Sequence, residues 1–397
     1  MFLRLSFVLL LTFVCCSPLL AQQPKKLIEF GGDAPDTSLL AARIRDMENT
    51  PFDGCVFQLT SDSPRGRERR ADFSWEGWGS RAFTKREMQQ VVNDLKSTEF
   101  KNFTDCFAQF NSAPGDVDWF SPDFSIVVNN ARLASWIAKE GGVKGVFFDT
   151  EYYQSRLWEY HKQVHAKTKS YQEYAAQLRK RGTEVMQAFQ SEYPEITIIL
   201  SYGYSGPWVD AHPWPFVPGQ DAFPEKSNDP RKLKFVPYGL QAPFMDGMID
   251  AAGPKVRLID GSEFTYTHAR QQEFLKARQM FRQEVLPLMA EDVRTKYPRV
   301  FSQALALWID VNWRQPGGWN FTDFTNNHWQ PEEFQLALTN ALKHTDEYVW
   351  LYSEHVSWFP PSRNVPAAYV EAVRNARSAA GLRDLKWEEK QVPTPTK

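Results

Sequence analysis

Short apolar runs and amphipathic segments alternate along this chain from residue 26 to residue 380. Each apolar run is nearly continuous and rich in β-branched and aromatic residues, which is typical of strands buried on both faces of a parallel sheet. The expected strands are 26–30, 55–59, 102–110, 143–149, 196–202, 256–260, 304–311 and 347–353. The helical patterns that follow them are 36–48, 84–97, 122–140, 168–193, 239–252, 268–297, 331–344 and 365–380.

Strict strand–helix alternation predicts an α/β fold, a single-domain (β/α)8 TIM barrel over residues 22–385. The boundary signals agree, because Asp36 can cap the first helix and Gly141 with Gly142 can end the third. The alternative is an open doubly wound sheet. That fold usually carries a glycine-rich phosphate turn after the first strand, and Gly31 with Gly32 alone matches such a turn poorly.

The first 21 residues have the pattern of a secretory signal peptide: one arginine, an apolar run, then small and polar residues. Cleavage is expected after Ala21, which predicts a secreted or periplasmic protein. Anchoring as a lipoprotein through Cys15 or Cys16 is less favoured, because the residues before them fit a lipobox poorly. No later stretch is long and apolar enough to cross a bilayer, and residues 386–397 read as a polar tail.

Composition narrows the range of partners. The formal net charge is −2 and there is no block of basic residues, which argues against a nucleic-acid partner. Aromatic residues are numerous, with 14 Trp, 14 Tyr and 29 Phe, which fits either a dense core or a surface on which sugar rings stack. Cys55 and Cys106 are expected to be buried free thiols. His161 and His165 are spaced for a metal but lack a third ligand, so no metal and no cofactor is expected.

Acidic side chains follow several of the expected strands, together with tyrosine, amide and tryptophan side chains. Because active sites of this barrel lie at the carboxyl ends of the strands, these residues should share one face. Paired carboxylates with aromatic neighbours suit glycoside hydrolysis. The candidate catalytic acids are Asp149, Glu151, Asp260, Glu263 and Glu354. The candidate substrate-binding residues are Tyr152, Tyr202, Tyr204, Asp310, Asn312, Trp313 and Trp358.

The stretch VKGVFFDTEYY, residues 143–153, carries the strongest of these signals. Asp149 and Glu151 are two residues apart, so on a strand their side chains point the same way. Two close carboxylates cannot both ionise at low cost, and one pKa therefore rises. A carboxyl group with a raised pKa is what general acid catalysis requires near neutral pH.

The same stretch resembles the fourth-strand signature of the chitinase-like family 18 glycosidases, D-G-x-D-x-D-x-E-Y. The similarity covers Gly145, Asp149, Glu151 and Tyr152, while Lys144 and Phe147 stand where the family has further acids. The resemblance implies that Glu151 is the proton donor. It also implies that Asp149 orients a substrate N-acetyl group acting as internal nucleophile. With an enzyme nucleophile instead, the acid facing Glu151 would be Glu354, Glu263 or Asp260.

Two classes of function follow from the sequence. The first is an exported glycoside hydrolase acting on a poly- or oligosaccharide, in which Glu151 faces another acid across the cleft. The second is a non-catalytic carbohydrate-binding barrel, in which Glu151 forms a salt bridge and has no opposed acid. A metal-dependent hydrolase is a third hypothesis and would require three converging ligands.

Overall fold

A computed structural model describes residues 24–32, 34–65, 69–211, 230–312, 318–383 and 385. The expected signal peptide at 1–21, the tail at 386–397 and the candidate residue Trp313 lie outside these ranges. No helix among the described residues is long and apolar enough to cross a membrane.

The nine strands of the main sheet are all parallel to their neighbours, in the order β10-β11-β1-β2-β5-β6-β7-β8-β9. They are β1 (Lys26–Gly31), β2 (Gly54–Phe57), β5 (Phe107–Asn111), β6 (Gly145–Asp149), β7 (Thr197–Leu200), β8 (Arg257–Asp260), β9 (Phe301–Gln303), β10 (Leu305–Trp308) and β11 (Tyr348–Ser353). Only Ala304 separates β9 from β10, so the two edges of the sheet are successive halves of one strand. The sheet therefore curls into a barrel of eight strand units, as expected from the sequence.

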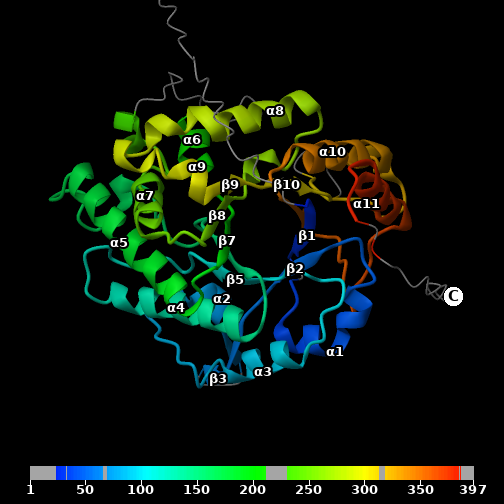
Figure 1. Ribbon diagram of the computed structural model, residues 1–397, viewed down its shortest axis with the longest axis horizontal. Helices are drawn as coiled ribbons and strands as arrows, with labels where there is room; N and C mark the ends of the chain where they lie inside the picture. Colours follow the sequence, from blue (N-terminus) through cyan, green and yellow to red (C-terminus); the bar gives the residue numbers. More distant parts are fainter. Residues whose placement is uncertain are drawn as a thin grey trace, which may run out of the picture.

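Helices surround this barrel on the outside (Figure 1). The eight that follow the barrel strands are α1 (Thr37–Met47), α3 (Gln89–Ser97), α4 (Phe124–Glu140), α5 (Tyr171–Glu192), α7 (Gln241–Ala251), α8 (Gln271–Gln279), α10 (Pro331–His344) and α11 (Ala367–Ala379). The Asp36 side chain accepts a hydrogen bond from the Leu39 N–H and caps α1, as expected. Gly142, just after α4, has a φ of 71°, which glycine adopts without strain.

Three segments differ from the sequence prediction. A hairpin, β3 (Thr60–Arg65) and β4 (Arg69–Asp72), and the short α2 (Phe73–Glu76) are inserted after β2. The irregular stretch expected at 203–238 contains α6 (Ser205–Ala211). The single helix expected at 268–297 is wrong: it ends at Gln279, where a π turn replaces it, and Pro287 follows in a 3-10 turn.

The remaining described helices are single turns or short pieces. They are η1 (Tyr160–Lys162), η2 (Pro230–Phe235), η3 (Glu263–Thr265), η4 (Met280–Glu284), η5 (Leu286–Leu288), η6 (Glu291–Val293), α9 (Tyr297–Val300) and η7 (Phe324–Asn326). Of these, η3 matters most for the site, because it directly follows β8.

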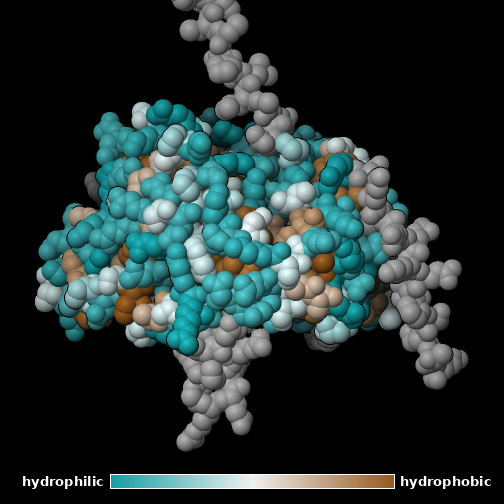
Figure 2. Space-filling view, turned by 60° about the horizontal axis from the view of Figure 1, so that its bottom comes forward, coloured by the Kyte–Doolittle hydropathy of each residue, from teal (hydrophilic) through white to brown (hydrophobic). Residues whose placement is uncertain are grey.

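The apolar side chains form two layers. The inner layer fills the barrel with residues such as Ile28, Val56, Phe107 and Trp350, and the outer layer packs the strands against the helices. Cys55 and Cys106 are buried and do not form a disulfide, as expected. Figure 2 shows a face on which hydrophilic residues predominate, with hydrophobic residues confined to small areas between them.

Candidate active site

A cavity of about 530 Å³ lies over the carboxyl ends of the barrel strands. Its floor is formed by the next inward-facing side chains along the strands, beyond the apolar inner layer. Side chains alternate along a strand, so residues two positions apart face the same way. Gln109 lies two residues past Phe107, Asp149 two past Phe147, and Tyr352 two past Trp350. The residues that line the cavity and belong to this strand layer are Phe30, Gln58, Gln109, Asp149, Trp308 and Tyr352.

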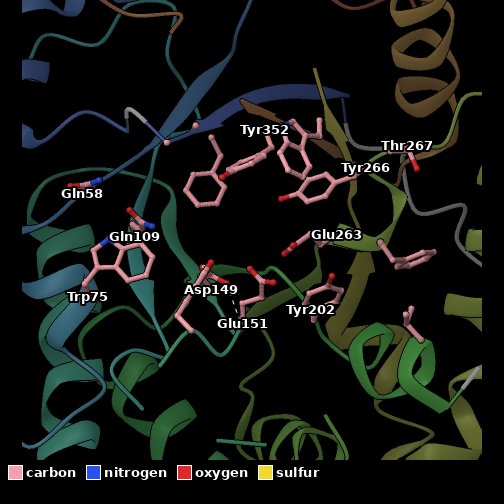
Figure 3. A pocket seen from close by; sticks show the side chains of 17 residues that line it. Gln58, Trp75, Gln109, Asp149, Glu151, Tyr202, Glu263, Tyr266, Thr267 and Tyr352 are labelled. Carbon is pink, nitrogen blue, oxygen red and sulfur yellow. Dashed lines mark hydrogen bonds between the residues drawn. The ribbon is translucent and has the colours of Figure 1, made fainter. Parts of the chain in front are cut away.

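Three acids meet in this cavity. The carboxylates of Asp149, Glu151 and Glu263 offer oxygens that all lie within 4.8 Å of one another. Figure 3 shows the three side chains pointing toward a common centre, with Tyr202 beside Glu263 and Tyr266 and Tyr352 across from them. Among the described residues that line the cavity there is no lysine or arginine. Within the described lining, the acidic cluster therefore has no neighbouring cation.

Asp149 is the most firmly held of the three. Its Oδ1 accepts hydrogen bonds from the Glu151 N–H at 3.0 Å and from the Ser201 hydroxyl at 2.8 Å. Its Oδ2 accepts one from the Tyr153 hydroxyl at 2.6 Å. Burial raises the pKa of Asp149, while these donors oppose the rise by stabilising the charged form.

Glu151 and Glu263 both hold their protons to higher pH than free glutamate does. Burial and the charge of Asp149 raise the pKa of Glu151 to about 7. Burial, together with the charges of Glu151 and Asp149, raises the pKa of Glu263 well above its ordinary value. A hydrogen bond from Tyr202 opposes that rise. Near neutral pH the cluster can therefore supply both a proton and a carboxylate.

Glu263 reaches the cavity through an unusual turn. Ser262, between β8 and η3, has a φ of 48°, a left-handed conformation that costs free energy for a residue with a side chain. Asp260 stabilises this turn, because its carboxylate accepts from the Ser262 N–H at 3.0 Å and from the Ser205 hydroxyl at 2.6 Å. Asp260 points away from the barrel interior and does not line the cavity. It acts on the cavity through the position of Glu263.

The structure places the other sequence-predicted residues in different surroundings. Tyr202 lines the cavity, whereas Tyr204 is buried and donates a hydrogen bond to Asp246. Tyr152 packs on Tyr238 outside the cavity lining. Trp358 is buried and packs edge-on against Phe52, also away from the cavity.

Asp310 and Glu354 form a structural unit after β10 and β11. The buried Asp310 carboxylate accepts from the backbone N–H groups of Glu354, His355 and Val356 and from the Trp308 indole. The Glu354 side chain is half exposed and is not among the residues that line the cavity. Asn312 does not line it either. Of the three acids considered as partners of Glu151, the structure brings only Glu263 to it.

Several lining residues had no counterpart among the candidates. Trp75 comes from α2 in the inserted segment, and Tyr153, Tyr266 and Thr267 come from loops. The sequence DFSWEGWG, residues 72–79, contains two tryptophans close to the second strand. Which of them faces the cavity depends on the path of the inserted hairpin. Trp75 lines the cavity, whereas Trp78 is fully buried against Phe148.

The acidic cluster also has the ligand chemistry of a hard divalent cation. Three carboxylates at this spacing can supply oxygen ligands to Mg²⁺ or Ca²⁺. The metal-dependent hypothesis therefore has three converging ligands among the described residues, all of them carboxylates. His165 belongs elsewhere, since its ring lies 3.1 Å from Asp118.

Neither a protein-family model nor a curated protein sequence matches the chain. Solved structures are similar in fold at low sequence identity. One is a psychrophilic glycoside hydrolase family 10 endo-β-1,4-xylanase, with 11% identity, 88% of this chain and 96% of that chain covered, and a TM-score of 0.42. Another is Aspergillus clavatus Sph3 in complex with GalNAc, with 12% identity, 89% and 98% covered, and a TM-score of 0.37.

A sugar phosphate isomerase/epimerase from Parabacteroides distasonis is also similar, with 10% identity, 92% of this chain and 99% of that chain covered, and a TM-score of 0.33. All three TM-scores are below 0.5, so these likenesses carry no conclusion about activity. The barrel is defined by the strand pairing of the chain itself, and the chemistry of the cavity by its own residues.

Proposed function

We propose that this protein is a glycoside hydrolase that cleaves poly- or oligosaccharides, with Glu151 as the general acid. The observation that carries the proposal is the convergence of Asp149, Glu151 and Glu263 within 4.8 Å of one another in a cavity lined by aromatic side chains. A carboxyl group with a pKa of about 7 can donate a proton to a leaving oxygen near neutral pH. Cleavage of a glycosidic bond needs that proton and a second group facing the anomeric carbon.

The spacing of the acids favours retention of configuration. Carboxyl groups of retaining enzymes lie about 5–5.5 Å apart, whereas inverting enzymes leave about 6.5–9.5 Å for a water molecule. One carboxylate oxygen of Glu151 and one of Glu263 lie within 4.8 Å of each other, which is nearer to the retaining separation than to the inverting one. In the proposed reaction the two glutamates share one proton, which Glu151 carries and donates to the leaving oxygen as the C–O bond breaks. The ionised Glu263 carboxylate then bonds to the anomeric carbon. Water then bonds to the anomeric carbon and gives a proton to Glu151, while the bond from that carbon to Glu263 breaks and restores the carboxylate.

Substrate assistance is the alternative route at the same site. An N-acetyl oxygen of the substrate would attack in place of Glu263, and Asp149 would orient that group, as the resemblance to family 18 implies. Asp149 suits this role because three donors hold it in one orientation. The two routes differ in substrate, since only the second requires an N-acetyl group next to the scissile bond.

The non-catalytic hypothesis is less well supported. It expects Glu151 in a salt bridge without an opposed acid. Within the part of the chain that the structure describes, no cation pairs with Glu151, and Glu263 lies across from it. A phosphorylated sugar is also disfavoured, because phosphate is normally bound by arginine, lysine or helix N-termini. We also propose that residues 1–21 act as a signal peptide that directs export of the protein.

The test is hydrolysis of α- and β-linked glycans, with and without N-acetyl groups, by wild type and Glu151→Gln. We expect the variant to lose about 10²- to 10⁴-fold in kcat while remaining folded, because it cannot donate the proton. Glu354→Gln is the matched control, since Glu354 is also a candidate catalytic acid by sequence but lies outside the cavity lining. Equal loss in both variants would contradict the assignment. Activity abolished by EDTA would favour the metal-dependent alternative.

A further inference from the structure

The cavity has a second group of polar and aromatic side chains apart from the acids. Gln58, Trp75 and Gln109 lie on one side of Asp149 and Glu151, while Glu263 and Tyr202 lie on the other (Figure 3). We name the first three residues the amide–indole wall. They come from different parts of the fold: Gln109 from β5, Gln58 from the residue after β2, and Trp75 from the inserted α2.

Gln109 lines this space and has an unsatisfied acceptor. The residue is only 3% exposed, and its buried Oε1 has no hydrogen-bond partner among the described residues. Leaving a buried acceptor without a partner is costly, so such a group in a cavity signals a missing donor. An amide oxygen accepts hydrogen bonds, and the complementary ligand group is therefore a hydroxyl or an N–H.

Trp75 is held beside this acceptor by a buried hydroxyl. The neighbouring Ser74 donates a hydrogen bond to the Gln109 carbonyl at 2.9 Å and accepts one from the Leu59 N–H at 2.8 Å. The Trp75 ring also contacts the Tyr153 ring, with centroids 4.9 Å apart. An indole fixed in this way offers a flat apolar surface next to an amide, the combination that fits one ring of a sugar.

Charge limits what that sugar can be. The described lining contributes three acids and neither lysine nor arginine, so an anionic ring would meet the negative charge of the cluster without a cation to pair with it. A ring without charge can hydrogen-bond to the amides without that electrostatic cost.

We propose that the amide–indole wall is a subsite for an uncharged pyranose ring, with a ligand hydroxyl or N–H donating to Gln109 Oε1. This inference rests on the proposed function, because the wall adjoins the acids that would cleave the bond. It predicts neutral or N-acetylated oligosaccharides as ligands and excludes uronic acids.

The experiment measures binding in the Glu151→Gln background, which prevents turnover. Isothermal titration uses xylotetraose, cellotetraose, maltotetraose, triacetylchitotriose and trigalacturonic acid. We expect at least one of the four uncharged oligosaccharides to bind and trigalacturonic acid not to bind. Failure of all four uncharged probes, or equally tight binding of trigalacturonic acid, overturns the inference.

Two further variants locate the ligand. Adding Gln109→Leu should weaken binding by about 3- to 10-fold, the loss of one hydrogen bond, and adding Trp75→Ala should weaken it by about 10-fold. The matched controls are Gln89→Leu at an exposed position of α3 and Trp136→Ala at a half-buried position of α4, neither of which lines the cavity. Unchanged affinity in both wall variants overturns the subsite.

The outcomes separate this inference from the proposed function. Binding that depends on Gln109, with no hydrolysis by wild type, would leave the subsite standing and refute the hydrolase. Hydrolysis that depends on Glu151, with affinity unaffected by Gln109→Leu and Trp75→Ala, would support the hydrolase and refute the subsite.

Discussion

At the scale of residues, the carboxylates at the strand ends divide by the direction in which each points. Asp149 follows the inward-facing Phe147 by two positions and therefore enters the cavity. Asp260 directly follows the inward-facing Ile259 and therefore points out of the barrel. Asp149 lines the cavity, while Asp260 supports the turn that presents Glu263.

We predict that Asp260→Asn lowers kcat by at least 10-fold with little change in substrate affinity. The Asp260 carboxylate accepts hydrogen bonds from the Ser205 N–H, the Ser205 hydroxyl and the Ser262 N–H, and an amide with one oxygen cannot accept all three in the same way. The left-handed turn at Ser262 should therefore relax and move Glu263. The measurement is kcat and KM of the folded variant on the best substrate.

Asp246→Asn is the control for a general loss of stability. Asp246 is also buried and accepts two hydrogen bonds, from Tyr204 and from the Ala290 N–H, but it lies outside the cavity lining. It should lower the melting temperature without lowering kcat. A parallel fall of kcat in both variants would mean that Asp260 has only a structural role.

At the scale of elements, the insertion after β2 distinguishes this barrel from a plain strand–helix repeat. The β3–β4 hairpin leads directly into α2, and α2 brings Trp75 over the carboxyl end of the sheet. Ser74 joins α2 to the end of β2 and to β5 through its two hydrogen bonds. One buried hydroxyl thus links the helix that carries Trp75 to two strands of the barrel.

We predict that Ser74→Ala lowers stability by about 1–3 kcal/mol, because the buried Leu59 N–H loses its acceptor. It should also raise KM several-fold, because Trp75 is no longer fixed. Urea unfolding and steady-state kinetics measure the two effects. Ser135→Ala is the matched control: this buried serine bonds only within α4, to the Arg132 carbonyl, and its loss should leave KM unchanged. An unchanged KM in Ser74→Ala would refute this coupling.

At the scale of the whole molecule, the acids impose a pH dependence on folding. Glutamate ionises near pH 4.5 when unfolded, whereas Glu151 in the folded chain ionises near pH 7. Between these values the folded state binds more protons than the unfolded state, so the free energy of unfolding falls as pH rises. Glu263, whose pKa is also raised, acts in the same direction.

We therefore predict that Glu151→Gln reduces the loss of stability between pH 5 and pH 8 by an amount on the order of 2 kcal/mol. Urea unfolding of wild type and variant at both pH values measures it. Glu354→Gln, with its half-exposed side chain, should keep the wild-type dependence. The same pH dependence in wild type and Glu151→Gln would contradict the burial of this carboxyl group.

The sequence by itself predicted the eight strand units, the helix that follows each of them and the strand ends where acids gather, although the helix expected at 268–297 ends at Gln279. Those features follow from local periodicity and from capping, which need no knowledge of distant residues. It also singled out Asp149 and Glu151, because their spacing is local. The tertiary structure alone decided that Glu263, and neither Asp260 nor Glu354, lies beside Glu151, and that Trp75 faces the cavity while Trp78 is core. Those choices depend on side-chain direction at the ends of separate strands, and on the path of the insertion, where no sequence period applies.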